Sequence, residues 1–286
     1  MSVVFWTGAV DGSFSTNGNW SATPADGDIA VINTGATDIP GGDFRTYAEF
    51  SSVIVGPGYT GNIGSSTTRA QITTNTLQLS NPGNVYVRLE LAADPSTEYR
   101  LLMNGWGKVV DIDDARANGT RQIHISEAAA ANSIATINAG ASAIATMTMA
   151  GMRSETINMT GSIATLRIDS GVLKGGDVTT KAVVSGGEWW CGDCADLQLY
   201  GGTVFPGAVD SSTITDAHIY GGTLSLEKAI GQAVTLPNGS TGHVNTYNKG
   251  VVDLQTGGVR PAFVSISRGS GLIYPASGES LTAGVA

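Results

Sequence analysis

Short stretches of alternating apolar and polar residues run through most of the chain. Leu166-Arg167-Ile168, Leu197-Gln198-Leu199 and Ile157-Asn158-Met159 each place apolar side chains two positions apart. This period of two is typical of a β-strand with one face in the core and the other in solvent. Most of these stretches are followed by a glycine within a few residues. Helical periodicity is nearly absent. The pattern therefore predicts many short strands joined by tight turns.

The strand-like stretches also recur at a regular interval. Residues 196–204 read DLQLYGGTV and residues 216–224 read DAHIYGGTL, with Asp, Tyr, Gly, Gly and Thr shared. A repeat of strand and turn on this scale is typical of a β-solenoid, in which each coil stacks on the next. We therefore expect an all-β fold, a parallel and right-handed β-solenoid (β-helix). The residues expected to shape the repeat are Gly171, Gly187, Gly202, Gly222, Tyr200 and Tyr220.

The regularity varies along the chain and predicts three parts. Residues 51–260 are expected to form the solenoid, which is most regular over 134–260. Residues 1–50 contain two tryptophans and several Asn-Gly and Asp-Gly turn signals, whereas residues 261–286 show no clear repeat. A bare terminal coil would expose sheet edges that invite aggregation. We therefore expect caps at both ends, the first of which also serves for attachment.

Composition and charge exclude several classes of protein. The 286 residues include 39 glycines without a G-X-Y period, which excludes collagen. A formal net charge of −9 leaves no basic surface for nucleic acid. The segment MSVVFWTGAV lacks the features of a secretory signal, and no window approaches the roughly 18 apolar residues of a membrane helix. We expect a soluble protein made in a cytoplasm, with neither a nucleic-acid nor a membrane partner.

The N-terminal segment contains a longer recognisable element. FWTGAVDGSFSTNGNWS at residues 5–21 is followed by GDIAVI at residues 27–32. This element resembles the start of many tailed-bacteriophage structural proteins, and also repeats in bacterial autotransporter passengers. Because autotransporters need export, the missing signal favours the phage family. The positions that match are Trp6, Gly8, Asn19, Trp20, Gly27 and Asp28.

The resemblance implies a structural protein of the virion, assembled in the host cytoplasm. Its first form is a capsid decoration or cement protein that binds the major capsid protein and copies of itself, as a homotrimer. The alternative is a tail spike or fibre protein that binds, or binds and cleaves, a host surface polysaccharide. A stand-alone polysaccharide lyase or hydrolase is a third class. The sequence has no nucleophile elbow, P-loop, dinucleotide fingerprint or zincin motif, so we expect no enzyme activity, no cofactor and no metal.

Asp196 and Asp216 are the weak catalytic candidates, because they hold the same place in consecutive repeats. Parallel pairing would bring them to about the 4.8 Å spacing of neighbouring strands. Two such carboxylates could share a proton, bind a cation or act as acid and base. Each also precedes a strand, where aspartate commonly bonds its own backbone, and we expect that turn role. His218 is expected to be a structural histidine on the polar face, and Tyr200 to stack on Tyr220.

Two further groups of residues suggest chemistry more weakly. Asp111, Asp113 and Asp114 lack the glycine-containing loop of a calcium site, so we expect exposed turn charges. Cys191 and Cys194 have the spacing of a redox pair or half a zinc site, but no second ligand pair accompanies them. A labile disulfide across their short turn is left open.

Four tryptophans are candidates for interface contacts. Trp189 and Trp190 are adjacent, so in a strand their side chains point to opposite faces. The outward ring could stack on a sugar or pack into a partner subunit, and we expect the second. Trp6 and Trp20 belong to the N-terminal element.

Overall fold

The computed structural model describes residues 1–43, 48–90, 98–116, 119–140, 143–229, 234–236, 244–247, 251–253, 266–268 and 272–274. The chain divides into two compact units, Met1–Ala145 with Met152–Gly161, and Thr146–Gly151 with Ser162–Ala286. Most of the expected C-terminal cap at 261–286 lies outside the described residues. None of the helices in the described part of the chain has the length and apolar character needed to cross a membrane.

The first unit consists of β-strands and one short 3-10 turn. Strands β11 (Ile144–Met149) and β12 (Thr156–Ile168) contribute to both units. The other elements of the first unit are β1 (Val3–Phe5), η1 (Asn17–Asn19), β2 (Ile29–Ile32), β3 (Gly42–Asp43), β4 (Phe50–Val55), β5 (Ala70–Leu79), β6 (Val85–Glu90), β7 (Tyr99–Met103), β8 (Val109–Asp114), β9 (Arg121–Ile125) and β10 (Ile134–Asn138).

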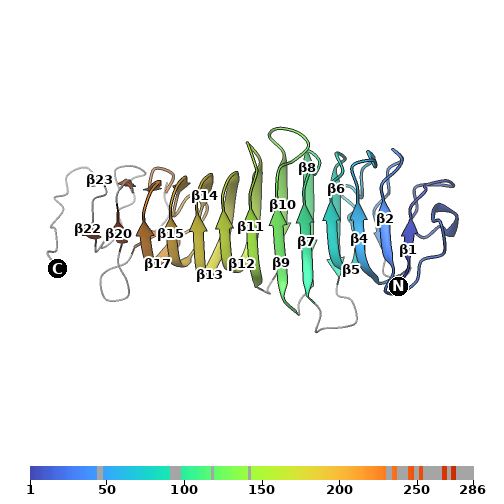
Figure 1. Ribbon diagram of the computed structural model, residues 1–286, viewed down its shortest axis with the longest axis horizontal. Coiled ribbons are helices and arrows are strands. Elements are labelled where there is room, and N and C mark those ends of the chain that lie inside the picture. Colours follow the sequence, from blue (N-terminus) through green and yellow to red (C-terminus); the bar gives the residue numbers. More distant parts are fainter. Residues whose placement is uncertain are drawn as a thin grey trace. The chain divides into compact units, whose positions relative to one another are not determined.

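Parallel pairing aligns the apolar positions of these strands into columns. Strands β1, β2, β4, β5, β7 and β9 follow one another side by side and point the same way (Figure 1). Successive inward positions are in register, so each buried side chain packs on the next. One such column contains Val4, Ala30, Val53, Leu77, Leu101 and Ile123, none more than 3% exposed. The prediction of an all-β fold with parallel strands is confirmed.

The prediction of a parallel β-solenoid, a right-handed β-helix, is wrong. The main sheet is a closed parallel β-barrel of eight strands within the described part of the chain. Strand β5 turns a corner of the sheet without ending, because residues Ala70–Thr73 pair with β6 whereas Thr76–Leu79 pair with β7. The sequence pattern breaks at such corners, and it therefore predicted separate short strands.

The second unit repeats the parallel pairing with its own set of strands. Its central inward column contains Leu173, Trp189, Val204, Leu224 and Val252, each at most 1% exposed. The strands are β13 (Val172–Val184), β14 (Glu188–Trp190), β15 (Cys194–Leu199), β16 (Thr203–Val204), β17 (Ser212–Ile219), β18 (Thr223–Ser225), β19 (Val234–Thr235), β20 (Val244–Thr246), β21 (Val251–Asp253), β22 (Ile266–Arg268) and β23 (Leu272–Tyr274).

A column of glycines forms one corner of the second unit. The backbone φ is positive at all four glycines, in a region that residues other than glycine rarely adopt. The values are +85° at Gly171, +70° at Gly187, +75° at Gly202 and +75° at Gly222. A Cβ at Gly202 would lie 2.4 Å from the carbonyl oxygen of Gly187, and one at Gly222 2.5 Å from that of Gly202. Each glycine therefore lets the backbone of the next repeat approach closely.

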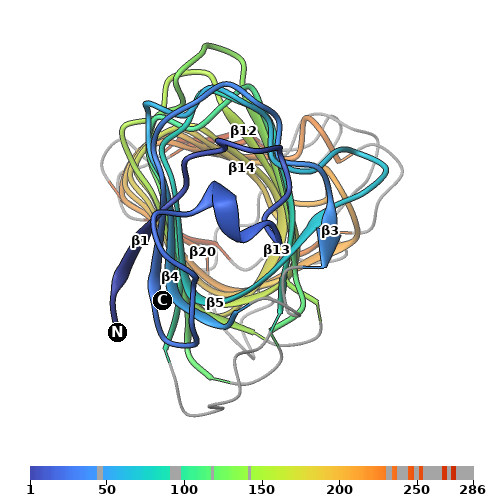
Figure 2. The ribbon, with the colours of Figure 1, turned by 90° about the vertical axis from the view of Figure 1, so that its right-hand side faces the viewer.

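An aromatic cluster closes the N-terminal end of the first unit. Trp6 stacks on Phe14 with ring centroids 5.0 Å apart, and Trp20 meets both rings edge-on. Trp20 also contacts Phe50 of β4, with centroids 5.9 Å apart. All four rings are buried. Figure 2 shows the short coil of η1 lying across this end of the unit.

Asn19 holds the loop that surrounds the aromatic cluster. Its Oδ1 accepts hydrogen bonds from the backbone N–H of Val10 and of Asp11, at 2.8 and 3.1 Å. Its Nδ2 donates to Asp11 Oδ1 and to the Ser13 carbonyl oxygen, at 2.6 and 2.8 Å. Asp28 is also buried and bonds two backbone N–H groups. The polar residues of the N-terminal element therefore fix its shape rather than face solvent.

Candidate functional site

An apolar patch lies on the outward face of strands β1, β2 and β4 of the first unit. β1 buries Val4 and exposes its two neighbours, and β2 alternates in the same way. Val3 and Phe5 are 50% and 52% exposed, and their register partners on β2, Ile29 and Val31, are partly exposed. On β4, Val31 pairs with the partly exposed Ile54, whereas Ile29 pairs with the polar Ser52. The residues of this N-terminal apolar patch are Val3, Phe5, Ile29, Val31 and Ile54.

The composition of the patch departs from that of an ordinary solvent-facing sheet. Such a face is normally polar, as it is on β5, where Gln78 pairs in register with Ile54. Contiguous exposed apolar residues mark contact sites for other macromolecules. The sequence carries the signal, because VVF and IAVI are apolar without interruption, whereas a search for alternating apolar and polar positions does not detect such runs.

The four tryptophan candidates have different environments. Trp6, Trp20 and Trp189 are buried in the chain's own core, so their rings have little surface left for a partner. Trp190 points outward and is half-buried. The pair Trp189 and Trp190 therefore divides between inside and outside as their adjacency predicts.

Trp190 lies in a cluster of cations and aromatic rings. The Nζ atoms of Lys174 and Lys228 lie 4.0 and 4.2 Å from the centroid of its ring. Lys228 Nζ is also 4.1 Å from the Phe205 ring, and 3.4 Å from Glu188 Oε2. The indole N–H donates to the same carboxylate at 3.1 Å. The half-buried ring of Trp190 therefore already makes its cation–π contacts with lysines of the chain itself.

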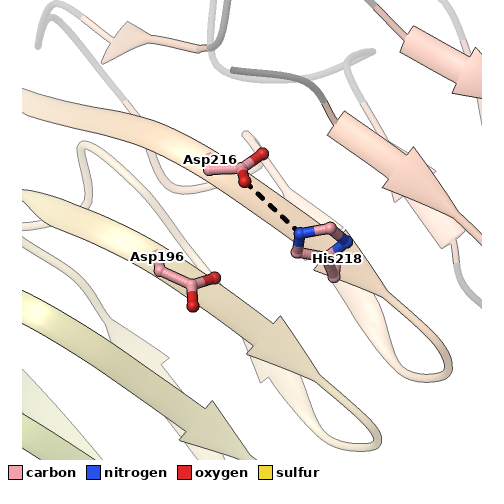
Figure 3. Close-up of side chains that lie close together, drawn as sticks. All are labelled: Asp196, Asp216 and His218. Atoms are coloured by element: carbon pink, nitrogen blue, oxygen red, sulfur yellow. Dashed lines mark ion pairs between the residues drawn. The ribbon is translucent and has the colours of Figure 1, made fainter. Parts of the chain in front are cut away.

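Asp196, Asp216 and His218 form a cluster on two neighbouring strands of the second unit. Asp196 on β15 is in parallel register with Asp216 on β17, and His218 follows two positions later on the same face (Figure 3). His218 Nε2 lies 3.3 Å from Asp216 Oδ2. One potential ligand atom from each of the three residues lies within 4.8 Å of the others. The repeat in the sequence predicts that the two aspartates lie together, but it did not identify His218 as a member of the same cluster.

Hydrogen bonds hold both carboxylates of the cluster. Both aspartates lie within strands β15 and β17 and not in turns before them, which corrects the expected turn role. Asp216 Oδ1 accepts a hydrogen bond from the backbone N–H of Ala217 at 3.0 Å. Asp196 Oδ2 accepts from Gln198 Nε2 at 3.5 Å. Asp196 Oδ1 is buried and has no hydrogen-bond partner among the described residues. The backbone contact therefore accounts for one oxygen of Asp216 only.

A ladder of tyrosines adjoins this cluster. Tyr200 stacks on Tyr220 and Tyr220 on Tyr247, with centroids 4.8 and 4.7 Å apart and rings nearly parallel. The imidazole of His218 lies nearly parallel to two of these rings, at 6.2 and 6.5 Å. Desolvation, followed by the charges of the neighbouring tyrosines, raises the pKa of Tyr220. Tyr200 is half exposed, so the end of the ladder faces solvent.

The two cysteines are free thiols in the core. Cys191 lies 3.5 Å from Ser212 Oγ, and burial raises the pKa of its thiol to about 12. Burial likewise raises the pKa of Cys194. Neither thiol is ionised near neutral pH, so neither has the character of a reactive cysteine.

The DIDD aspartates lie in strand β8 and not in a turn, which corrects that expectation. Each of them forms an ion pair with an arginine. Asp114 is buried, and its partner Arg116 is buried with it. The pairs are Asp111 with Arg69 at 2.7 Å, Asp113 with Arg88 at 3.1 Å and Asp114 with Arg116 at 2.8 Å.

Comparisons with protein-family models, with curated proteins and with solved structures find no match to this chain. The function must therefore be inferred from the two sites described above, the N-terminal apolar patch and the Asp196–Asp216–His218 cluster.

Proposed function

We propose that this chain is a structural protein of a tailed-phage virion, a capsid decoration or cement protein that binds the major capsid protein through its N-terminal apolar patch. The observation that carries the proposal is the apolar outward face of β1 and β2, where Val3 and Phe5 are half exposed. Full burial of a phenylalanine side chain contributes about 1.5–3 kcal/mol, and burial of the exposed half of Phe5 contributes about half of that. Several such side chains together supply much of the energy of a subunit contact.

The geometry of the N-terminal element adds support. The aromatic cluster and the hydrogen bonds of Asn19 hold the loop beside β1 in one conformation. A patch on a preorganised segment binds without the entropic cost of ordering that segment. The residues through which the chain resembles phage structural proteins, Trp6, Asn19 and Trp20 among them, are those that shape this segment.

Cryo-electron microscopy of virions that contain the chain tests the proposal directly. We expect density for this protein over the capsid shell, in contact with the major capsid protein. Density confined to the tail would overturn the cement role in favour of a spike or fibre. Density in neither place would overturn the virion role altogether.

A binding experiment tests the patch itself. Co-sedimentation of the purified chain with shells of the major capsid protein should be lost when Phe5 and Val31 are both replaced by serine. Ile134 on β10 is also apolar and 46% exposed but lies outside the patch, so Ile134→Ser is the matched control and should sediment like the wild type. Equal loss in both variants would show that the patch is not the contact. Analytical ultracentrifugation of the same samples tests the expected homotrimer.

The alternative of a tail spike that binds a surface glycan is favoured by one observation, the solvent-facing end of the Tyr200–Tyr220–Tyr247 ladder. Aromatic rings of this kind stack on sugars. If the alternative holds, the wild-type chain will bind capsule or lipopolysaccharide from the host, and a Tyr200→Ala variant will bind it more weakly.

A further inference from the structure

We propose that Asp196, Asp216 and His218 form a binding site for one divalent metal ion of the zinc class, bridging strands β15 and β17. The proposal is independent of the virion role. It starts from the ligand atoms, which come from two carboxylates and one imidazole and lie within 4.8 Å of one another. All three side chains emerge on one face of two neighbouring strands (Figure 3).

The distance between the atoms of Asp216 and His218 suits a shared metal ion. With metal–ligand bonds of about 2.0–2.1 Å, two ligand atoms of a tetrahedral zinc site lie about 3.4 Å apart. His218 Nε2 and Asp216 Oδ2 are 3.3 Å apart. One carboxylate oxygen of Asp196 lies within 4.8 Å of the other two ligand atoms and supplies the third potential ligand.

The state of Asp196 is a second and independent indication of a ligand. Its Oδ1 atom is buried without a hydrogen-bond partner among the described residues, although a buried carboxylate oxygen is costly to leave unsatisfied. No lysine or arginine of the described residues forms an ion pair with Asp196. A cation at the cluster would satisfy this oxygen and offset the charge.

Neighbouring groups already orient the three side chains. The Ala217 N–H holds one oxygen of Asp216 and leaves the other facing His218. Gln198 bonds Asp196, and the imidazole lies nearly parallel to the rings of the tyrosine ladder. Partners that fix the orientation of ligands in this way raise the affinity of metal sites.

The ligand set also selects the metal. One imidazole with two carboxylates suits zinc, cobalt or manganese, whereas calcium prefers six to eight oxygen ligands. Three protein ligands leave a position open to water, as in zinc sites that are not closed structural ones. We therefore expect zinc to bind more tightly than calcium.

Isothermal titration of the full-length, tag-free chain with Zn²⁺ tests the proposal. We expect one ion per chain, and a loss of affinity of about tenfold or more in each of Asp196→Asn, Asp216→Asn and His218→Gln. Glu188→Gln removes one exposed carboxylate of the same unit and should bind like the wild type. Visible absorption of bound Co²⁺ provides a second readout, since its intensity reports tetrahedral coordination, and it should disappear in His218→Gln.

The substitutions are close in size to the residues they replace, and circular dichroism checks that each variant folds. The proposal is overturned if the wild type shows no saturable binding. It is equally overturned if the three variants bind as the wild type does, because the ion would then occupy another place such as Cys191 and Cys194.

Discussion

Replacing Gly202 by alanine tests how closely the repeats of the second unit pack. The residue has a φ of +75°, and a Cβ there would lie 2.4 Å from the carbonyl oxygen of Gly187 and 2.7 Å from the carbonyl carbon of Gly186. Both contacts are with backbone, so no flexible side chain can move aside. Either the two repeats separate locally or the glycine corner changes conformation.

The expected cost has two parts that a control variant separates. Alanine in the left-handed region costs roughly 1–2 kcal/mol. Forcing a methyl group into a packed region typically costs about 1–3 kcal/mol more. Gly151 has nearly the same φ, +70°, lies in the same unit, and has no atom within 4 Å of the position of an added Cβ. Gly151→Ala should therefore lose only the first part, and Gly202→Ala about 2–5 kcal/mol in total.

Urea unfolding provides the measurement. Tryptophan fluorescence, with Trp189 and Trp190 as reporters in the second unit, and far-ultraviolet circular dichroism give the midpoint and slope for each variant. Comparing the two alanine variants with the wild type yields both differences. If Gly202→Ala destabilises no more than Gly151→Ala, the repeats do not pack as closely as argued, and the explanation of the glycine column is wrong.

Three further predictions concern ionisable groups. Hydrogen bonds from Ser13, Asn19 and Thr16 lower the pKa of Asp11 from its ordinary value of 3.8. The ionised carboxylate therefore stabilises the fold fully above pH 3.8, and this stabilisation is lost as the pH falls through the lower folded-state pKa. Asp11→Asn should flatten the acid limb of a pH–stability curve. Cys191, with a pKa of about 12, should react with a thiol reagent at pH 8 only after denaturation, and rapid reaction of the native chain would contradict its burial. Asp114→Asn removes the buried partner of an arginine and should cost about 3–5 kcal/mol in urea unfolding, whereas Asp111→Asn, at an exposed pair, should cost about 1 kcal/mol or less.

The repeat in the sequence predicts much of the local geometry of the second unit. Residues 196–204 and 216–224 lie in parallel register, which brings Asp196 beside Asp216 and stacks Tyr200 on Tyr220. This works because parallel pairing converts equal positions in a repeat into neighbours in space, at the spacing of two strands. The position of His218 follows from the same register, since residues two apart in a strand share a face.

The closed sheet could not be predicted in the same way. The backbone φ is positive at Gly161 in β12 and at Gly175 and Gly176 in β13. Each strand nevertheless continues past its glycines and is 13 residues long in total. The sequence pattern interprets such glycines as strand ends. Whether a strand ends or only bends at a glycine depends on which strands pair with the residues after the glycine. That pairing is decided by the tertiary fold and not by the local sequence.

The columns that the repeat produces differ in their energetic consequences, and this difference singles out the cluster. Stacked tyrosines attract each other, and stacked glycines permit the close approach of backbones. Two aspartates at about 4.8 Å repel, by about 1 kcal/mol in water and about 3.5 kcal/mol at an effective dielectric constant of 20. Asp216 is 37% exposed, so the cost lies between these values. The Asp196–Asp216 column is therefore the one of the three that opposes stacking, and a bound cation would turn its repulsion into a cross-link between β15 and β17.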